Sequence, residues 1–177
     1  MIKKKPYIIP YVGLKNEKYD FKFQLDKEFF NREGNTLVRE GRVTVAVSLD
    51  KSLQPHILDF VVDGTILAEC DRCVSDIDLP IHQSYRVYVK LESDKDIEAD
   101  ENLEMLYLHP EDQEIDVEQY LYDFTLLAVP FTKKCEDVQQ ECDPEVTKYI
   151  VSKEELKEED NSIDPRWEKL KKLKDFK

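Results

Sequence analysis

The chain has 177 residues, of which 41% are apolar, so it is long enough for one domain with a buried core. Its formal net charge of −13 argues against a large RNA-binding face, because an acidic surface repels phosphate and attracts basic partners. Only 4 glycines are present, which leaves little room for a glycine-rich nucleotide-binding loop.

The amino terminus is basic but carries no long apolar run. Three lysines occupy positions 3–5, and the apolar stretch at residues 7–12 is short and contains Pro10. A secretory signal or a membrane span needs a longer apolar stretch. The sequence therefore predicts a cytoplasmic protein, in which cysteines are thiols or metal ligands rather than disulfides.

The first half of the chain shows the alternation of apolar and polar residues that is typical of β-strands. The alternation and apolar runs predict strands over residues 19–25, 43–49, 57–62, 65–68 and 79–91. Asp26 is predicted to cap a short helix over residues 26–30, and Gly34-Asn35 and Asp63-Gly64 are predicted to form turns. Short turns between consecutive strands imply an antiparallel sheet.

The second half begins with an acidic block. Residues 92–123 hold thirteen acidic residues against one lysine, and residues 92–102 are predicted to form a mobile loop. One more strand is predicted over residues 103–108. Asp116 is predicted to begin an amphipathic helix that ends at Pro130. The residues predicted to share one face of this helix are Val117, Tyr120, Leu121, Phe124 and either Leu127 or Ala128.

The remainder of the chain is polar. Residues 131–161 are predicted to be irregular, apart from a short helix near residues 152–157. Asp164-Pro165 has the pattern of an N-cap and a first helical residue, and Trp167, Leu170 and Leu173 follow at helical spacing beside many lysines.

Together these patterns predict an α+β fold. A mainly antiparallel sheet over residues 5–108 is expected to be covered by the helix that starts at Asp116, within one domain over residues 1–150. Residues 151–177 are expected to form a charged tail with a short basic helix.

Cys70-Asp71-Arg72-Cys73 is the sharpest chemical motif in the sequence. Two thiolates at this spacing can chelate one Zn²⁺, and Cys135 and Cys142 are the candidates for the other two ligands. Two other interpretations stay open, namely a reduced pair without metal and a redox couple. The redox interpretation requires the pair at a helix N-terminus, whereas the flanking segments are predicted to be strands.

No catalytic constellation is evident. His56, His82 and His109 form no metalloprotease motif, and no serine occupies a nucleophile-elbow motif. The alternating acids at residues 94–100 lack the glycine and the closing glutamate of a calcium loop. The sequence therefore predicts a protein that is not an enzyme and has no small-molecule substrate.

Several segments in order resemble the YceD-like family. An apolar strand leads into Cys70-Asp71-Arg72-Cys73, and a strand with Pro80 follows. A helix begins at Ile115-Asp116-Val117 and stops at Pro130, and the segment around Cys135 and Cys142 comes next. The chain closes with the segment from Asp164-Pro165 to Lys174, which is rich in leucine and lysine. Many relatives carry a denser second cysteine cluster with glycine, which is absent here.

The resemblance implies a role in the synthesis, processing or stability of large-subunit ribosomal RNA. It transfers Cys70, Arg72 and Cys73 as the family motif, and no catalytic residues. An acidic protein in this role is expected to bind a basic ribosomal protein or assembly factor through residues 92–123. The rival expectation is direct contact with precursor RNA through Arg72 and the two basic tails, residues 3–5 and 166–177.

Overall fold

A computed structural model of the protein describes residues 7–31, 38–91 and 105–150, and it has the predicted α+β architecture. The strands are β1 (Ile8–Pro10), β2 (Lys18–Leu25), β3 (Glu40–Asp50), β4 (His56–Glu69), β5 (Asp76–Leu91), β6 (Met105–Leu108) and β7 (Glu114–Asp116). The helices are α1 (Lys27–Phe30), α2 (Glu118–Leu127), the 3₁₀ helix η1 (Cys135–Val138) and α3 (Pro144–Thr147). Within these described residues, no helix is long and apolar enough to cross a membrane.

Four predictions lie outside the described residues. They concern the turn at residues 34–35, the acidic loop over 92–102, the short helix near 152–157 and the basic helix from 164 to 174.

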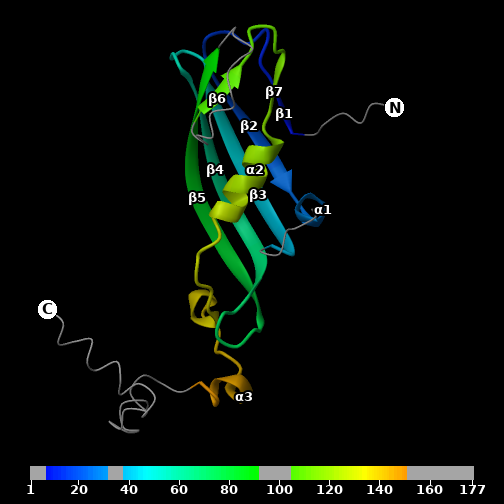
Figure 1. The fold of residues 1–177 in the computed structure, drawn as a ribbon, viewed down its shortest axis with the longest axis vertical. Helices are drawn as coiled ribbons and strands as arrows, with labels where there is room; N and C mark the ends of the chain where they lie inside the picture. The colour runs from blue at the N-terminus through cyan, green and yellow to red at the C-terminus, as the bar shows by residue number, and fades with distance from the viewer. Residues whose placement is uncertain (1–6, 32–37, 92–104, 151–177) are drawn as a thin grey trace, which may run out of the picture.

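The main sheet has the strand order β2-β3-β4-β5-β6. Neighbouring strands from β2 to β5 are antiparallel, as predicted, whereas β6 pairs with the end of β5 in parallel. Strands β1 and β7 form a separate antiparallel pair. Figure 1 shows α2 lying across one face of the main sheet, and α3 lying beyond the lower end of the sheet.

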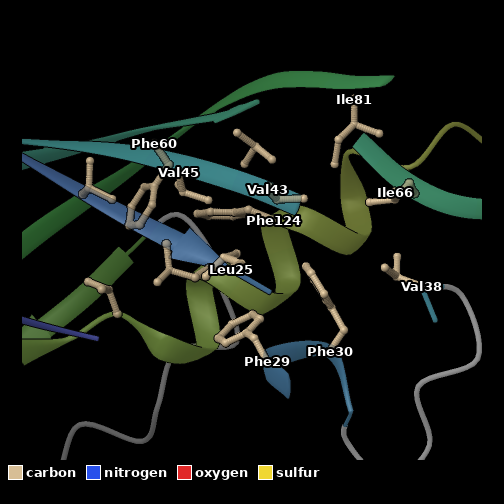
Figure 2. Packing of buried hydrophobic residues seen from close by; sticks show 14 of the residues in the cluster. Leu25, Phe29, Phe30, Val38, Val43, Val45, Phe60, Ile66, Ile81 and Phe124 are labelled. Atoms are coloured by element: carbon tan, nitrogen blue, oxygen red, sulfur yellow. The ribbon is translucent and has the colours of Figure 1, made fainter. Parts of the chain in front are cut away.

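The core lies between the sheet and α2. The alternation predicted for β2 and β3 is observed, because Val43, Val45 and Val47 are buried while the residues between them are more exposed. Phe124 of α2 stacks on Tyr85 with ring centroids 4.4 Å apart, and it meets Phe60 edge-on at 5.1 Å. Figure 2 shows Val43, Val45 and Phe60 among the side chains around Phe124. This packing holds α2 on the sheet and thereby positions the segment that follows it.

The prediction of a hairpin turn at Asp63-Gly64 was wrong. Strand β4 runs through Gly64, which lies opposite Val43 on one side and Ile81 on the other. A Cβ at Gly64 would lie 2.4 Å from the Arg42 carbonyl oxygen and 2.7 Å from the Val43 Cα. The glycine is therefore required by the close approach of β3, and not by a turn. The actual turn between β4 and β5 spans residues 70–75.

The predicted start of the main helix was two residues early. Asp116 ends β7, and its carboxylate accepts a hydrogen bond from the Glu118 backbone N–H at 3.0 Å, in the first turn of α2. Ala128, rather than the exposed Leu127, packs against the core. The helix ends before Pro130, as predicted.

The short helices show how strongly local capping matters. Asp26 caps α1 as predicted, by accepting hydrogen bonds from the backbone N–H groups of Glu28 and Phe29. Helices η1 and α3 lie in a segment that was predicted to be irregular, because four-residue helices are too short to show a hydrophobic period. The pair Asp143-Pro144 is an N-cap signal that marks α3 in the sequence.

Candidate metal centre

The structure brings together the four cysteines that the sequence singled out. Cys70 and Cys73 lie in the turn between β4 and β5, Cys135 is the first residue of η1, and Cys142 lies just before α3. Their four sulfur atoms all lie within 4.8 Å of one another. The packing of α2 and the chain path after Pro130 therefore carry the second pair of sulfurs to the first.

The sulfur geometry fits one tetrahedral metal ion. Four thiolates at about 2.3 Å from a zinc ion lie about 3.8 Å apart. The Sγ atoms of Cys70 and Cys142 are 3.8 Å apart, and those of Cys73 and Cys135 are 3.5 Å apart. All four cysteines are free, and an all-sulfur donor set favours soft metals such as zinc. The residues present therefore form a candidate metal site.

Backbone amides point at the sulfurs of the turn. The Arg72 N–H donates to Cys70 Sγ at 3.4 Å. Burial raises the pKa of Cys70, but N–H donors from Cys73, Arg72 and Cys135 outweigh it and lower that pKa. Hydrogen bonds from the Ser75 hydroxyl and from the N–H groups of Asp143 and Ser75 lower the pKa of Cys73 to about 6. The pKa of each turn cysteine is thus lowered toward the thiolate, which is the form that binds metal.

The pKa values of the second pair of cysteines, Cys135 and Cys142, are raised rather than lowered. Burial raises the pKa of Cys135, and hydrogen bonds with the neighbouring cysteines raise it further. Burial also raises the pKa of Cys142. These shifts favour the thiol form of both groups. A bound cation would stabilise all four as thiolates and release their protons.

The two residues between the cysteines of the turn attach it to the second cysteine segment. The Asp71 N–H donates to the Lys133 carbonyl at 2.7 Å, and the Lys133 N–H donates to the Asp71 carboxylate at 2.7 Å. This second hydrogen bond is the main reason that the pKa of Asp71 is lowered. The Arg72 guanidinium pairs with Glu136 at 2.8 Å. Arg72 of the predicted motif therefore has a structural contact, and Asp71 is a residue that sequence reasoning missed.

The turn is closed by two backbone hydrogen bonds and includes a strained residue. The Val74 N–H donates to the Cys70 carbonyl and the Cys70 N–H donates to the Ser75 carbonyl, each at 2.9 Å. Val74 has a φ of +62°, in the left-handed region that β-branched residues rarely adopt. Backbone strain of this kind often occurs at functional sites, and here it lets the chain fold back around the sulfurs.

Replacing Val74 with glycine is expected to raise the free energy of unfolding by about 1 kcal/mol, because glycine adopts positive φ without strain. Val74 is 67% exposed, so little packing is lost. The matched control is Val12→Gly, at an exposed valine with no positive φ, which is expected to lower the free energy of unfolding by roughly 0.5–1 kcal/mol. Urea unfolding measures both, and destabilisation of similar size in the two variants would contradict the strain at Val74.

The surroundings of the turn do not match the redox interpretation. The Cys70–Cys73 pair is flanked by β4 and β5, as the sequence predicted, and not by the start of a helix. A redox couple of the thioredoxin type relies on a helix N-terminus to lower the pKa of its thiol. Here hydrogen bonds within the turn lower it instead.

The three histidines lie apart from the cysteine cluster. His56 Nδ1 is 2.6 Å from the Leu53 carbonyl oxygen, His82 contacts Asp63, and His109 Nδ1 accepts a hydrogen bond from the Glu111 N–H. Each histidine thus has a local partner, and none belongs to the candidate metal centre.

Comparison with known proteins identifies a family that the chain matches. The sequence model of a family described as "Large ribosomal RNA subunit accumulation protein YceD" matches residues 58–174, roughly two thirds of the chain. The matched range begins inside β4 and includes all four cysteines and α2. No curated protein and no solved structure matches the chain.

Proposed function

The chain belongs to the YceD family, and we propose that it is a non-enzymatic, cytoplasmic factor in the synthesis, processing or stability of large-subunit ribosomal RNA. The observation that carries this proposal is the family match over residues 58–174. That range includes both cysteine segments and the helix that positions the second of them, so the matched region and the candidate metal centre coincide.

The centre supports a structural role rather than a catalytic one. We propose that Cys70, Cys73, Cys135 and Cys142 hold one zinc ion, which links the β4–β5 turn to the segment after α2. A site with four protein ligands leaves no open position for water or substrate, unlike catalytic zinc sites. The ion would therefore supply a cross-link within the fold and no reaction chemistry.

The acidity of the chain favours a protein partner. A net charge of −13 attracts basic ribosomal proteins and assembly factors, and it repels the phosphates of RNA at long range. This favours a second candidate function, a small zinc- or thiol-containing interaction module that binds a basic ribosomal protein. The two candidates are compatible, since such an interaction would promote the accumulation of large-subunit RNA.

Depletion of the protein tests the proposed function. The ratio of large-subunit to small-subunit ribosomal RNA should fall, and a plasmid copy of the wild-type gene should restore it. Northern blots of precursor and mature RNAs measure this ratio. Equal loss of both RNAs, or no loss of either, would contradict the assignment.

Recovery of the tagged protein from native cytosol identifies the kind of partner. A stoichiometric basic protein in the recovered complex supports the interaction module. Ribosomal RNA that is recovered without a protein partner, and is lost at high salt, would instead support direct RNA binding.

A further inference from the structure

A broad hollow lies on the face of the sheet opposite α2, next to the candidate metal centre. Its volume is about 1040 Å³. The floor includes Thr65 and Leu67 of β4, which alternate with the buried Ile66 and so face away from α2. One wall is formed by the start of α1 and β3, and the other by β5 and residues 137–139 at the end of η1. We call this hollow the lower groove.

The lining of the lower groove combines apolar surface with an excess of negative charge. Leu67, Pro80 and Val138 supply the apolar part. The lining also includes four acidic residues, Asp26, Glu40, Asp78 and Asp137, and two basic residues, Lys27 and Arg42. Lys27 already pairs with Glu40 across the first wall.

Asp78 differs from the other three carboxylates, because within the described part of the chain its side chain has neither a hydrogen bond nor an ion pair, whereas Asp26 and Asp137 accept backbone hydrogen bonds and Glu40 pairs with Lys27. Lysine and arginine side chains suit such a surface, since their aliphatic stems cover apolar groups while their charged ends reach carboxylates. A phosphate backbone does not suit it, because like charges repel.

The second wall depends on the cysteine centre. Cys135 is both a candidate ligand and the first residue of η1, and residues 137–139 of the wall follow directly. Glu136 is held to the turn by Arg72, and Asp137 accepts a hydrogen bond from the Lys134 N–H at 2.7 Å. Loss of the metal would release Cys135 from the turn, so the wall would no longer be fixed beside β5.

We propose that the lower groove binds an extended segment, rich in lysine or arginine, of a protein of the large ribosomal subunit, and that the metal centre builds one wall of this binding site. This inference rests on the proposed function and gives it a location. In this inference the partner binds mainly to the open face of the sheet, and not to the acidic block over residues 92–123 as the sequence predicted. The charge of the lining selects the protein component of the ribosome over the RNA.

Photo-crosslinking of the full chain in cells tests the site. The substitution Leu67→p-benzoylphenylalanine places the crosslinker on the floor of the groove. The expected crosslinked peptide is rich in lysine or arginine and comes from a large-subunit ribosomal protein. Adding Asp78→Lys should lower the crosslink yield roughly fivefold, as expected for reversal of a charge that faces a cation. The zinc-site variant Cys70→Ser should lower the yield at least as much.

The matched control is Asp20→Lys, which should leave the yield unchanged. Asp20 is an exposed residue of β2 on the same face of the sheet as Asp78, but it lies outside the lower groove. Crosslinks to ribosomal RNA at position 67, or equal effects of the two reversals, would overturn the inference. So would the lack of any crosslink in cells where the protein still co-sediments with large-subunit precursors. Failure to co-sediment with these precursors would overturn the proposed function itself, and the inference with it.

Discussion

Replacing Cys70 with serine is expected to release the bound metal and to loosen residues 131–150, while leaving the main sheet folded. Structural zinc contributes on the order of 10 kcal/mol to folding in small metal-dependent modules. Here the sheet has its own core, in which Leu58, Phe60 and Val62 are fully buried. The loss should therefore be confined to the segment whose attachment depends on the centre.

Metal analysis of protein purified without chelator measures the first part of this prediction. Wild-type protein is expected to contain about one equivalent of zinc, and the variant less than about a tenth. Amide exchange measures the second part, with faster exchange expected over residues 131–150 and unchanged protection in β3 and β4.

The control variant replaces the most exposed of the four cysteines with histidine, which is also a zinc ligand. Cys142 is the least buried of the four cysteines, so histidine can be accommodated there, and Cys142→His is expected to retain zinc. Wild-type protein with less than about a tenth of an equivalent of zinc would show that the cysteines form a metal-free thiol cluster at a turn.

Replacing Gly64 with alanine is expected to lower the free energy of unfolding by about 3 kcal/mol. The added Cβ would lie 2.4 Å from the Arg42 carbonyl oxygen and 2.7 Å from the Val43 Cα. Both atoms belong to the backbone of β3, so they cannot move away as a flexible side chain would. Strands β3 and β4 would have to separate, which would weaken the pairing on which the core depends.

Thermal or urea unfolding measures this effect. Thr65→Ala, one residue along the same strand and on its exposed side, is the matched control and should change stability by less than about 0.5 kcal/mol. A Gly64→Ala variant as stable as this control would mean that β3 and β4 are not in close contact at this position. Neither substitution is expected to change the zinc content, because Cys70 lies six residues beyond Gly64.

The sequence by itself determined two of the strands and one helix cap. The alternation over residues 19–25 and 43–49 predicted β2 and β3 together with their buried faces, because a strand's two faces follow directly from a period of two. Asp26 predicted α1 because capping is a contact between neighbours in the chain. The residue types of the Cys70–Cys73 motif were sufficient to propose a metal site.

The tertiary structure alone decided how these pieces meet. Asp63-Gly64 has the composition of a turn, and only the approach of β3 shows that the glycine lies inside a strand. The parallel pairing of β6 with β5 is likewise a contact between distant segments, for which local patterns carry no signal. Whether Cys135 and Cys142 reach the turn depended on the packing of α2 and on the hydrogen bonds between Asp71 and Lys133. Short-range patterns record the conformation of neighbouring residues, whereas a site built from segments some 60 residues apart exists only once the core has formed.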